Sequence, residues 1–100
     1  MPTFICTLHW TDQGIRSVTD ALKRRQSARR VAEKLGITIK DVYITTGDSD
    51  VLVILEAPDG DTAAKFSLAT ASQGNTRSST CRAFTETEFD ALIKGIPPVN

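Results

Sequence analysis

The pattern of apolar and polar positions changes its period along the first third of the chain. Residues 3–10 alternate, which is typical of a β-strand with one buried side. One side of this alternation carries Phe4, Cys6, Leu8 and Trp10, and the other carries Ile5, Thr7 and His9. From Ile15 to Leu35 apolar residues recur at intervals of three, four or multiples of these, which predicts an amphipathic helix interrupted near Asp20 and stopped by Gly36.

Residues 37–55 have the composition of two paired strands. β-branched residues dominate Ile37 to Thr46, although Lys40-Asp41 interrupts the run. The segment Gly47-Asp48-Ser49-Asp50 consists of turn-forming residues, and Val51 to Leu55 is an unbroken apolar run. Two such runs joined by a short turn predict a β-hairpin.

The second half repeats the order helix then strand. Pro58 and Asp59 favour the start of a helix, because proline is tolerated in the first turn and a carboxylate stabilises the positive end of the helix dipole. Gly74-Asn75 ends this helix, and residues 76–84 form a last strand of mostly polar character.

A short helix follows the last strand. Thr85 and Glu88 have the spacing of a capping box, ahead of a segment that carries Phe89, Leu92 and Ile93. Two strand-helix-strand units with right-handed crossovers fold most simply into an antiparallel sheet ordered 4-1-3-2. We therefore predict an α+β, ferredoxin-like βαββαβ fold with an added C-terminal helix, formed as one domain by residues 1–100.

The third strand is apolar on both sides. An antiparallel strand with one side in water should alternate, and Val51 to Leu55 does not. Helices account for the covering of one face of the sheet, and a second copy of the same sheet is the simplest covering for the other. We therefore expect a homo-oligomer, and a dimer as its smallest form.

Charge is unevenly distributed in a chain whose formal net charge is zero. Arg16 to Lys40 holds eight of the twelve basic residues and two of the twelve acidic ones, so this segment carries +6 and the remainder −6. Such a separation can attract a partner copy, an anionic ligand or nucleic acid. No aromatic residue is interleaved with the basic residues, and the pI is about 6.5, so nucleic-acid binding is not expected and a solvated helix face is favoured.

The chain has the features of a cytoplasmic protein. Its first residues carry no basic leader, and its longest apolar run has five residues, far fewer than the roughly 20 that cross a membrane. The two cysteines, Cys6 and Cys81, have no disulfide-framework spacing and are expected to be thiols. They lie on strands that should be neighbours, but metal binding would need two further ligands, so no metal site is expected.

The candidate chemistry is sparse. His9, the only histidine, could act as a general base or a metal ligand if the strand registers bring Tyr43 and Arg82 to it; the alternative is an ordinary hydrogen-bonded or solvent-facing strand histidine. Asp50 is a fourth candidate ligand-binding residue, although Asp48 and Asp50 are also typical of a tight turn. No phosphate loop, dinucleotide fingerprint or nucleophile elbow is present, and no cofactor is indicated.

Four separated segments have a distinctive sequence: Trp10 to Arg16, Gly47 to Asp50, Glu56 to Asp59, and Gly74 to Arg77. Together, and in this order, they resemble the GYD-domain family, which implies a ferredoxin-like, dimeric α/β-barrel type of fold. Ser49 replaces the tyrosine of the family's Gly-x-Tyr-Asp stretch, so a role for that ring does not transfer. A similar hairpin occurs in the effector-binding domains of leucine-responsive, AsnC-like regulators, which suggests ligand binding by analogy.

The resemblance implies a fold and leaves the activity open. Two functional hypotheses follow from the sequence. The first is a homo-oligomeric module, not assigned to catalysis, that binds a small molecule at a sheet or subunit interface. The second is a small enzyme resembling dimeric α/β-barrel monooxygenases, in which His9, Tyr43 and Arg82 would contact the substrate.

Overall fold

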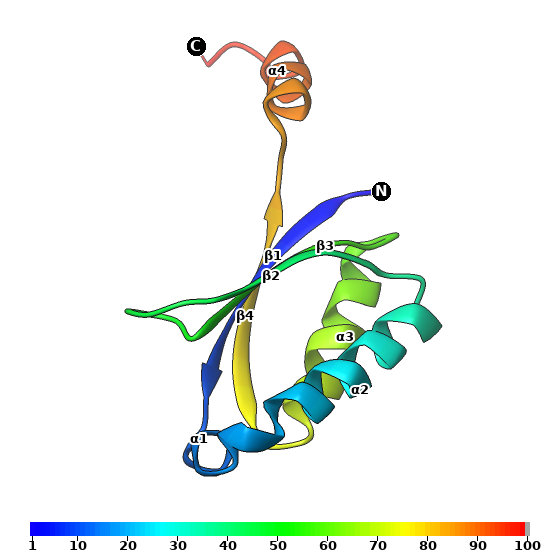
Figure 1. The fold of residues 1–100 in the computed structure, drawn as a ribbon. Coiled ribbons are helices and arrows are strands. Elements are labelled where there is room, and N and C mark those ends of the chain that lie inside the picture. Colours follow the sequence, from blue (N-terminus) through cyan, green and yellow to red (C-terminus); the bar gives the residue numbers. More distant parts are fainter. Residues whose placement is uncertain (100) are drawn as a thin grey trace.

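The computed structural model describes residues 1–99, and its strands and helices follow the predicted order (Figure 1). The elements are β1 (Thr3–Trp10), α1 (Asp12–Arg16), the 3₁₀ turn η1 (Val18–Asp20), α2 (Ala21–Lys34), β2 (Thr38–Ile44), β3 (Val51–Glu56), α3 (Gly60–Ala71), β4 (Thr76–Ala83) and α4 (Glu86–Lys94). The predicted interruption near Asp20 is confirmed, because η1 separates α1 from α2.

The four strands form one antiparallel sheet in the order β2-β3-β1-β4, so the predicted ferredoxin-like fold is confirmed. The interruption expected at Lys40-Asp41 is a register shift between Ile39 and Asp41 in the pairing of β2 with β3. Helices α2 and α3 lie on one face of the sheet, and the other face carries no helix of the described chain (Figure 1).

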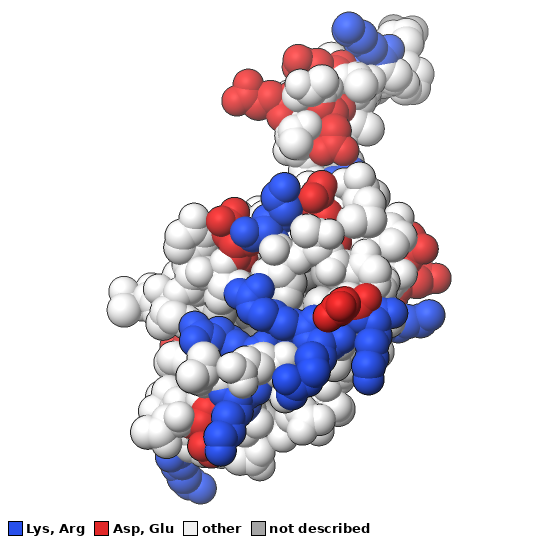
Figure 2. Space-filling model, turned by 45° about the vertical axis from the view of Figure 1, so that its right-hand side comes forward, with Lys and Arg blue, Asp and Glu red and all other residues white. Residues whose placement is uncertain are grey.

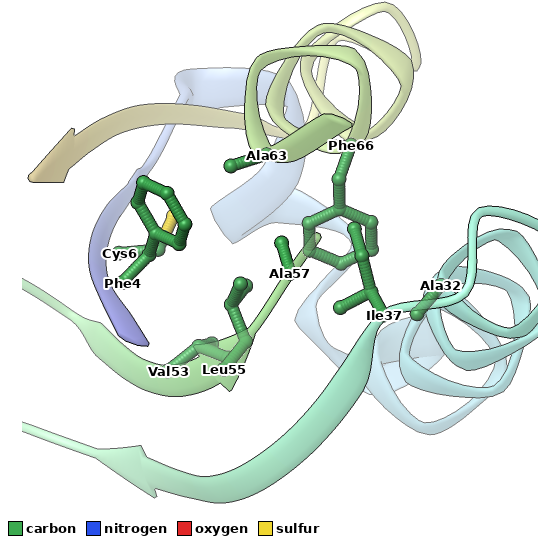
Figure 3. Close-up of a cluster of buried hydrophobic side chains, with 9 residues drawn as sticks. All are labelled: Phe4, Cys6, Ala32, Ile37, Val53, Leu55, Ala57, Ala63 and Phe66. Carbon is green, nitrogen blue, oxygen red and sulfur yellow. The ribbon is translucent and has the colours of Figure 1, made fainter. Parts of the chain in front are cut away.

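The hydrophobic core lies between the sheet and these two helices (Figure 3). It consists of Phe4, Cys6, Ala32, Ile37, Val53, Leu55, Ala57, Ala63 and Phe66. Phe66 is the one large side chain that the helices contribute to this set, whereas α2 contributes only Ala32. The side chains between α2 and the sheet are therefore mostly ones that are only partly buried.

The ends of α3 and α4 are set by side-chain caps. Asp59 is the N-cap of α3, and its carboxylate accepts a hydrogen bond from the Thr62 amide at 2.8 Å; Pro58 therefore precedes the cap instead of lying in the first turn. The predicted capping box of Thr85 and Glu88 is confirmed at the start of α4. Helix α4 projects beyond the end of β4, away from the sheet and from α2 and α3 (Figure 1).

Among residues 1–99, no helix is both long enough and apolar enough to cross a membrane.

Candidate functional site

The face of the sheet opposite α2 and α3 presents an apolar centre. The strand registers place Ile54 beside Ile5, and Leu52 beside Thr7. Tyr43 lies beside Leu52 from the neighbouring strand β2, and its side chain is 55% exposed. Ile5, Leu52 and Ile54 are only half-buried, because nothing in residues 1–99 packs on them as a further layer. We call Ile5, Tyr43, Leu52 and Ile54 together the open-face patch.

His9 lies at the end of this open face, next to Arg77 of β4 in the strand register. Its Nε2 atom donates a hydrogen bond to the carbonyl oxygen of Asp48 in the β2–β3 turn. A carbonyl oxygen only accepts, so Nε2 carries the hydrogen and Nδ1 is left for any further contact. The exposed ring thus ties β1 to the hairpin turn, which is a structural role.

Asp50 fastens the same hairpin to β1. Its carboxylate accepts a hydrogen bond from the Trp10 amide at 2.9 Å, and its own amide donates to the Leu8 carbonyl at 2.9 Å. The turn itself is closed by the Thr45 hydroxyl, which donates to the Ser49 carbonyl at 2.7 Å. The aspartate of the Gly-x-x-Asp segment therefore extends the pairing with β1 to the residue just before β3. A ligand-binding role for it stays a prediction.

Arg82 does not join His9 and Tyr43, contrary to the expectation that the three could meet. It pairs with Phe4 in the register, so its side chain belongs to the helix side of the sheet. There its guanidinium lies 4.3 Å from the centre of the Phe84 ring and forms a 2.9 Å ion pair with Glu88. A single site built from His9, Tyr43 and Arg82 is therefore not formed within this chain.

The two cysteines also lie on opposite faces. β1 and β4 are neighbours as predicted, but Cys6 pairs with Thr80 and Cys81 pairs with Ile5. Cys6 is buried under the helices, and its burial raises the pKa of the thiol, whereas Cys81 is exposed on the open face. Both are free thiols. No group of three or more His, Cys, Asp or Glu side chains able to hold a metal ion occurs within residues 1–99.

A cavity of about 500 Å³ lies between the helices α2 and α3 and the hairpin end of the sheet. Leu8 and Trp10 of β1 and Val51 of β3 are part of its floor, and Ala28 and Val31 of α2 are part of its wall. This volume is within the range of about 300–1,000 Å³ typical of ligand pockets. Sequence reasoning missed it, and the available signal was the small size of the apolar residues on α2.

Basic side chains of α2 surround this cavity. Lys23, Arg24, Arg25 and Arg29 all line it. The Arg24 guanidinium donates to the Ser17 and Gly14 carbonyls at 3.0 and 3.2 Å, so it caps the end of α1. Figure 2 shows Lys and Arg gathered in a band across the helical side, and Asp and Glu both on the projecting α4 and at several places on the body of the molecule.

Two of the segments that resemble the GYD family pack against each other at this end of the molecule. The Thr11 amide donates to the Asn75 carbonyl at 3.1 Å, and the Thr11 hydroxyl donates to the Gly74 carbonyl at 2.6 Å. The Gln13 side-chain amide donates to the Asn75 side chain at 2.9 Å. Gly14 is buried, and a Cβ atom there would lie 2.0 Å from the Asn75 carbonyl oxygen. These motif residues join β1 to β4.

Comparison with known proteins agrees with this architecture. The model of the protein family described as "GYD domain" matches residues 4–93 of this chain. The chain is also 28% identical over 95 residues to a protein of Thermus thermophilus named "Glutamine synthetase and cystathionine beta-lyase binding protein", and the alignment covers 94% of this chain and 100% of that protein. Because the family match spans nine-tenths of the sequence and includes all four strands, the chain belongs to the GYD-domain family.

Proposed function

We propose that this protein is a binding module that associates with itself through the open face of its sheet and whose further partners are other proteins. The observation that carries the proposal is the open-face patch. Leu52 and Ile54 face away from the helices on a strand whose other side, with Val53 and Leu55, is buried in the core. An apolar patch at the centre of an uncovered sheet is typical of a protein interface.

The name of the Thermus relative supports partners that are proteins. The alignment runs over nearly the full length of both chains, so the surface that the relative uses has a counterpart here. By this similarity we propose that the partners include amino-acid-metabolising enzymes of the kind in that name. Free thiols at Cys6 and Cys81 agree with the reducing cytoplasm as the place of action.

Self-association is tested by size-exclusion chromatography with light scattering at micromolar concentration. Wild-type protein should be oligomeric, and Leu52→Lys should be shifted toward the monomer because a lysine ammonium cannot be buried in an apolar interface without a partner. Leu68→Lys is the matched control, since Leu68 is 71% exposed on α3. A monomeric wild-type protein would refute the self-association part of the proposal.

Partner binding is tested separately, with purified glutamine synthetase and cystathionine beta-lyase from the organism that encodes the chain. Biolayer interferometry should show saturable binding to at least one of them. Tyr43→Ala should weaken it, because exposed aromatic side chains dominate interface energies. Absence of binding to both enzymes, with oligomers still formed, would restrict the function to self-association.

A small molecule bound at the subunit interface is the second candidate, favoured by the position of His9 and Tyr43 on the same uncovered face. A second copy packed there would enclose both side chains. A crystal structure of the oligomer should then contain density for a compound between the two sheets. The enzyme hypothesis required His9, Tyr43 and Arg82 to contact one substrate. The fold does not support it, because Arg82 lies on the other side of the sheet.

A further inference from the structure

Helix α4 exposes an apolar stripe that nothing in residues 1–99 covers. Phe89, Leu92 and Ile93 follow the spacing i, i+3, i+4 of one helix face, and Ile96 continues the spacing just beyond the last helical residue. Each of the four is 48–64% exposed. Only nine residues are helical, and isolated helices shorter than about 12–15 residues are marginally stable in water. A helix of this length and pattern is therefore expected to be stabilised by packing against another surface.

The attachment of α4 to the domain is polar and local. Glu88 connects the helix to Arg82 by an ion pair at 2.9 Å, and it accepts a hydrogen bond from the Thr85 amide at 2.9 Å. These contacts fix the first turn at the end of β4. They leave the apolar stripe facing solvent, in the part of the molecule that projects from the sheet (Figure 1).

The cavity between α2 and the sheet has the complementary character. Its floor is apolar, and Lys23, Arg25 and Arg29 at its border form no ion pair with any acidic residue among residues 1–99. On α4 the carboxylates of Glu86 and Asp90 are likewise free of ion pairs in the described chain. One molecule therefore carries an acidic helix with exposed apolar side chains and an apolar cavity with a basic border. Figure 2 shows acidic side chains on α4 and the band of basic side chains on the helical side.

The helix cannot reach the cavity of its own chain. The cavity lies where β1 ends and β4 begins, with Trp10 and Thr76 in its lining, whereas α4 follows the other end of β4. The eight residues of β4 separate the two by about 26 Å at the rise of an extended strand. Moving α4 into the cavity would require β4 to leave the sheet. A copy of α4 that entered this cavity would therefore belong to another molecule.

We propose that α4 of one copy docks into the cavity between α2 and the sheet of a second copy. The apolar stripe of α4 packs on the floor around Leu8 and Trp10, and Glu86 and Asp90 pair with the basic border of α2. This interface is on the helical side, so it is separate from the open-face interface proposed above. Two copies that exchange helices reciprocally form a closed dimer, and head-to-tail docking forms a ring or filament.

Disulfide trapping in the full-length chain tests the proposal directly. In a Cys81→Ser background, Leu92→Cys places a thiol on the α4 stripe and Ala28→Cys places one in the cavity wall. The two variants are mixed and oxidised gently. The expected product is a covalent heterodimer. Ala64→Cys, an alanine exposed on α3 outside the cavity, is the matched control acceptor.

Several outcomes would overturn the proposal. One is a heterodimer yield with Ala28→Cys no greater than with Ala64→Cys. Another is an intramolecular disulfide when Leu92→Cys and Ala28→Cys are in one chain at high dilution, since α4 would then reach its own cavity. A third is anilinonaphthalene sulfonate binding to the cavity that is unchanged by Leu92→Asp, which would show that α4 does not compete for the cavity.

Charge exchange provides an independent test that does not alter the apolar surfaces. Arg25→Glu should weaken α4-dependent self-association about tenfold, as measured by analytical ultracentrifugation in low salt. Asp90→Arg on the donor should restore it when mixed with Arg25→Glu. Equal association of all combinations would show that these charges do not meet. Because both side chains are exposed, the variants should fold, and circular dichroism checks this.

Discussion

Replacing Gly14 with alanine should destabilise the fold, because this residue of α1 lies directly against the turn that precedes β4. A Cβ atom at this position would lie 2.0 Å from the Asn75 carbonyl oxygen and 2.8 Å from its carbon. Contacts of this length do not occur, so the two backbone segments must separate by about 1 Å. The clash involves backbone atoms and not the end of a flexible side chain, so moving them apart costs free energy.

The magnitude follows from the contacts that this separation breaks. The Thr11 amide and hydroxyl donate to Asn75 and Gly74 at 3.1 and 2.6 Å. Each such hydrogen bond contributes about 1 kcal/mol net, and forcing a methyl group into a packed site costs about 1–3 kcal/mol. The expected loss is about 3 kcal/mol, which lowers the melting temperature of a domain of this size by roughly 15 °C.

Urea unfolding measured by Trp10 fluorescence and circular dichroism provides the assay, at one fixed protein concentration because oligomers make stability concentration-dependent. Gly60→Ala is the control. Nothing lies within 4 Å of a Cβ added there, and the residue begins α3, so this variant should gain about 0.5 kcal/mol. If the free energy of unfolding of Gly14→Ala is within about 0.5 kcal/mol of the wild-type value, the proposed close approach of α1 to the turn before β4 is wrong.

Three further outcomes are expected. Asp50→Ala should cost about 1–2 kcal/mol in urea unfolding, because the half-buried Trp10 amide loses its acceptor, whereas Asp50→Asn should retain most of the stability. Hydrogen bonds from the Thr85 amide and Arg82 lower the pKa of Glu88 in the folded chain. The Glu88 carboxylate therefore stabilises α4 at pH values above its unfolded pKa of 4.5, and this stabilisation is lost as the pH falls through its folded pKa. The ¹³Cα chemical shifts of the helix should report the loss in a titration from pH of about 6 to about 3. In the monomeric protein, Cys81 should react with a thiol-specific disulfide reagent roughly tenfold or more faster than Cys6, and equal rates would show that the burial is not as described.

Local patterns were enough to predict the order of the strands and helices. The hairpin at Gly47 to Asp50 and the capping box of Thr85 and Glu88 depend on residues close together in sequence, and both are confirmed. The interruption at Lys40-Asp41 was also visible, because polar residues broke a β-branched run. Such features depend on backbone preferences and short-range hydrogen bonds, which can be predicted from residues that are close together in the sequence.

The arrangement of the candidate site depends on how strands and helices pack against one another, which the sequence pattern does not determine. Whether Arg82 shares a face with His9 is decided by the register of β4 on β1, and a slip of one residue reverses the side of every side chain. Nothing in the polar pattern of residues 76–83 fixed that register. The cavity was missed for a related reason, since its volume depends on how closely α2 approaches the sheet, and small residues such as Ala28 leave space there.

The two proposed interfaces are on opposite sides of one sheet, and this has a consequence for any protein partner. A partner enzyme that binds the open-face patch must displace the second copy from Leu52 and Ile54, because both would cover the same side chains. By mass action, the apparent affinity for that partner then falls as the concentration of the module rises. A partner that instead binds beside α2 competes with α4, and its affinity falls with self-association only when α4 is intact. The dependence of partner affinity on module concentration, compared between wild type and Leu92→Asp, therefore distinguishes which side of the sheet the partner uses.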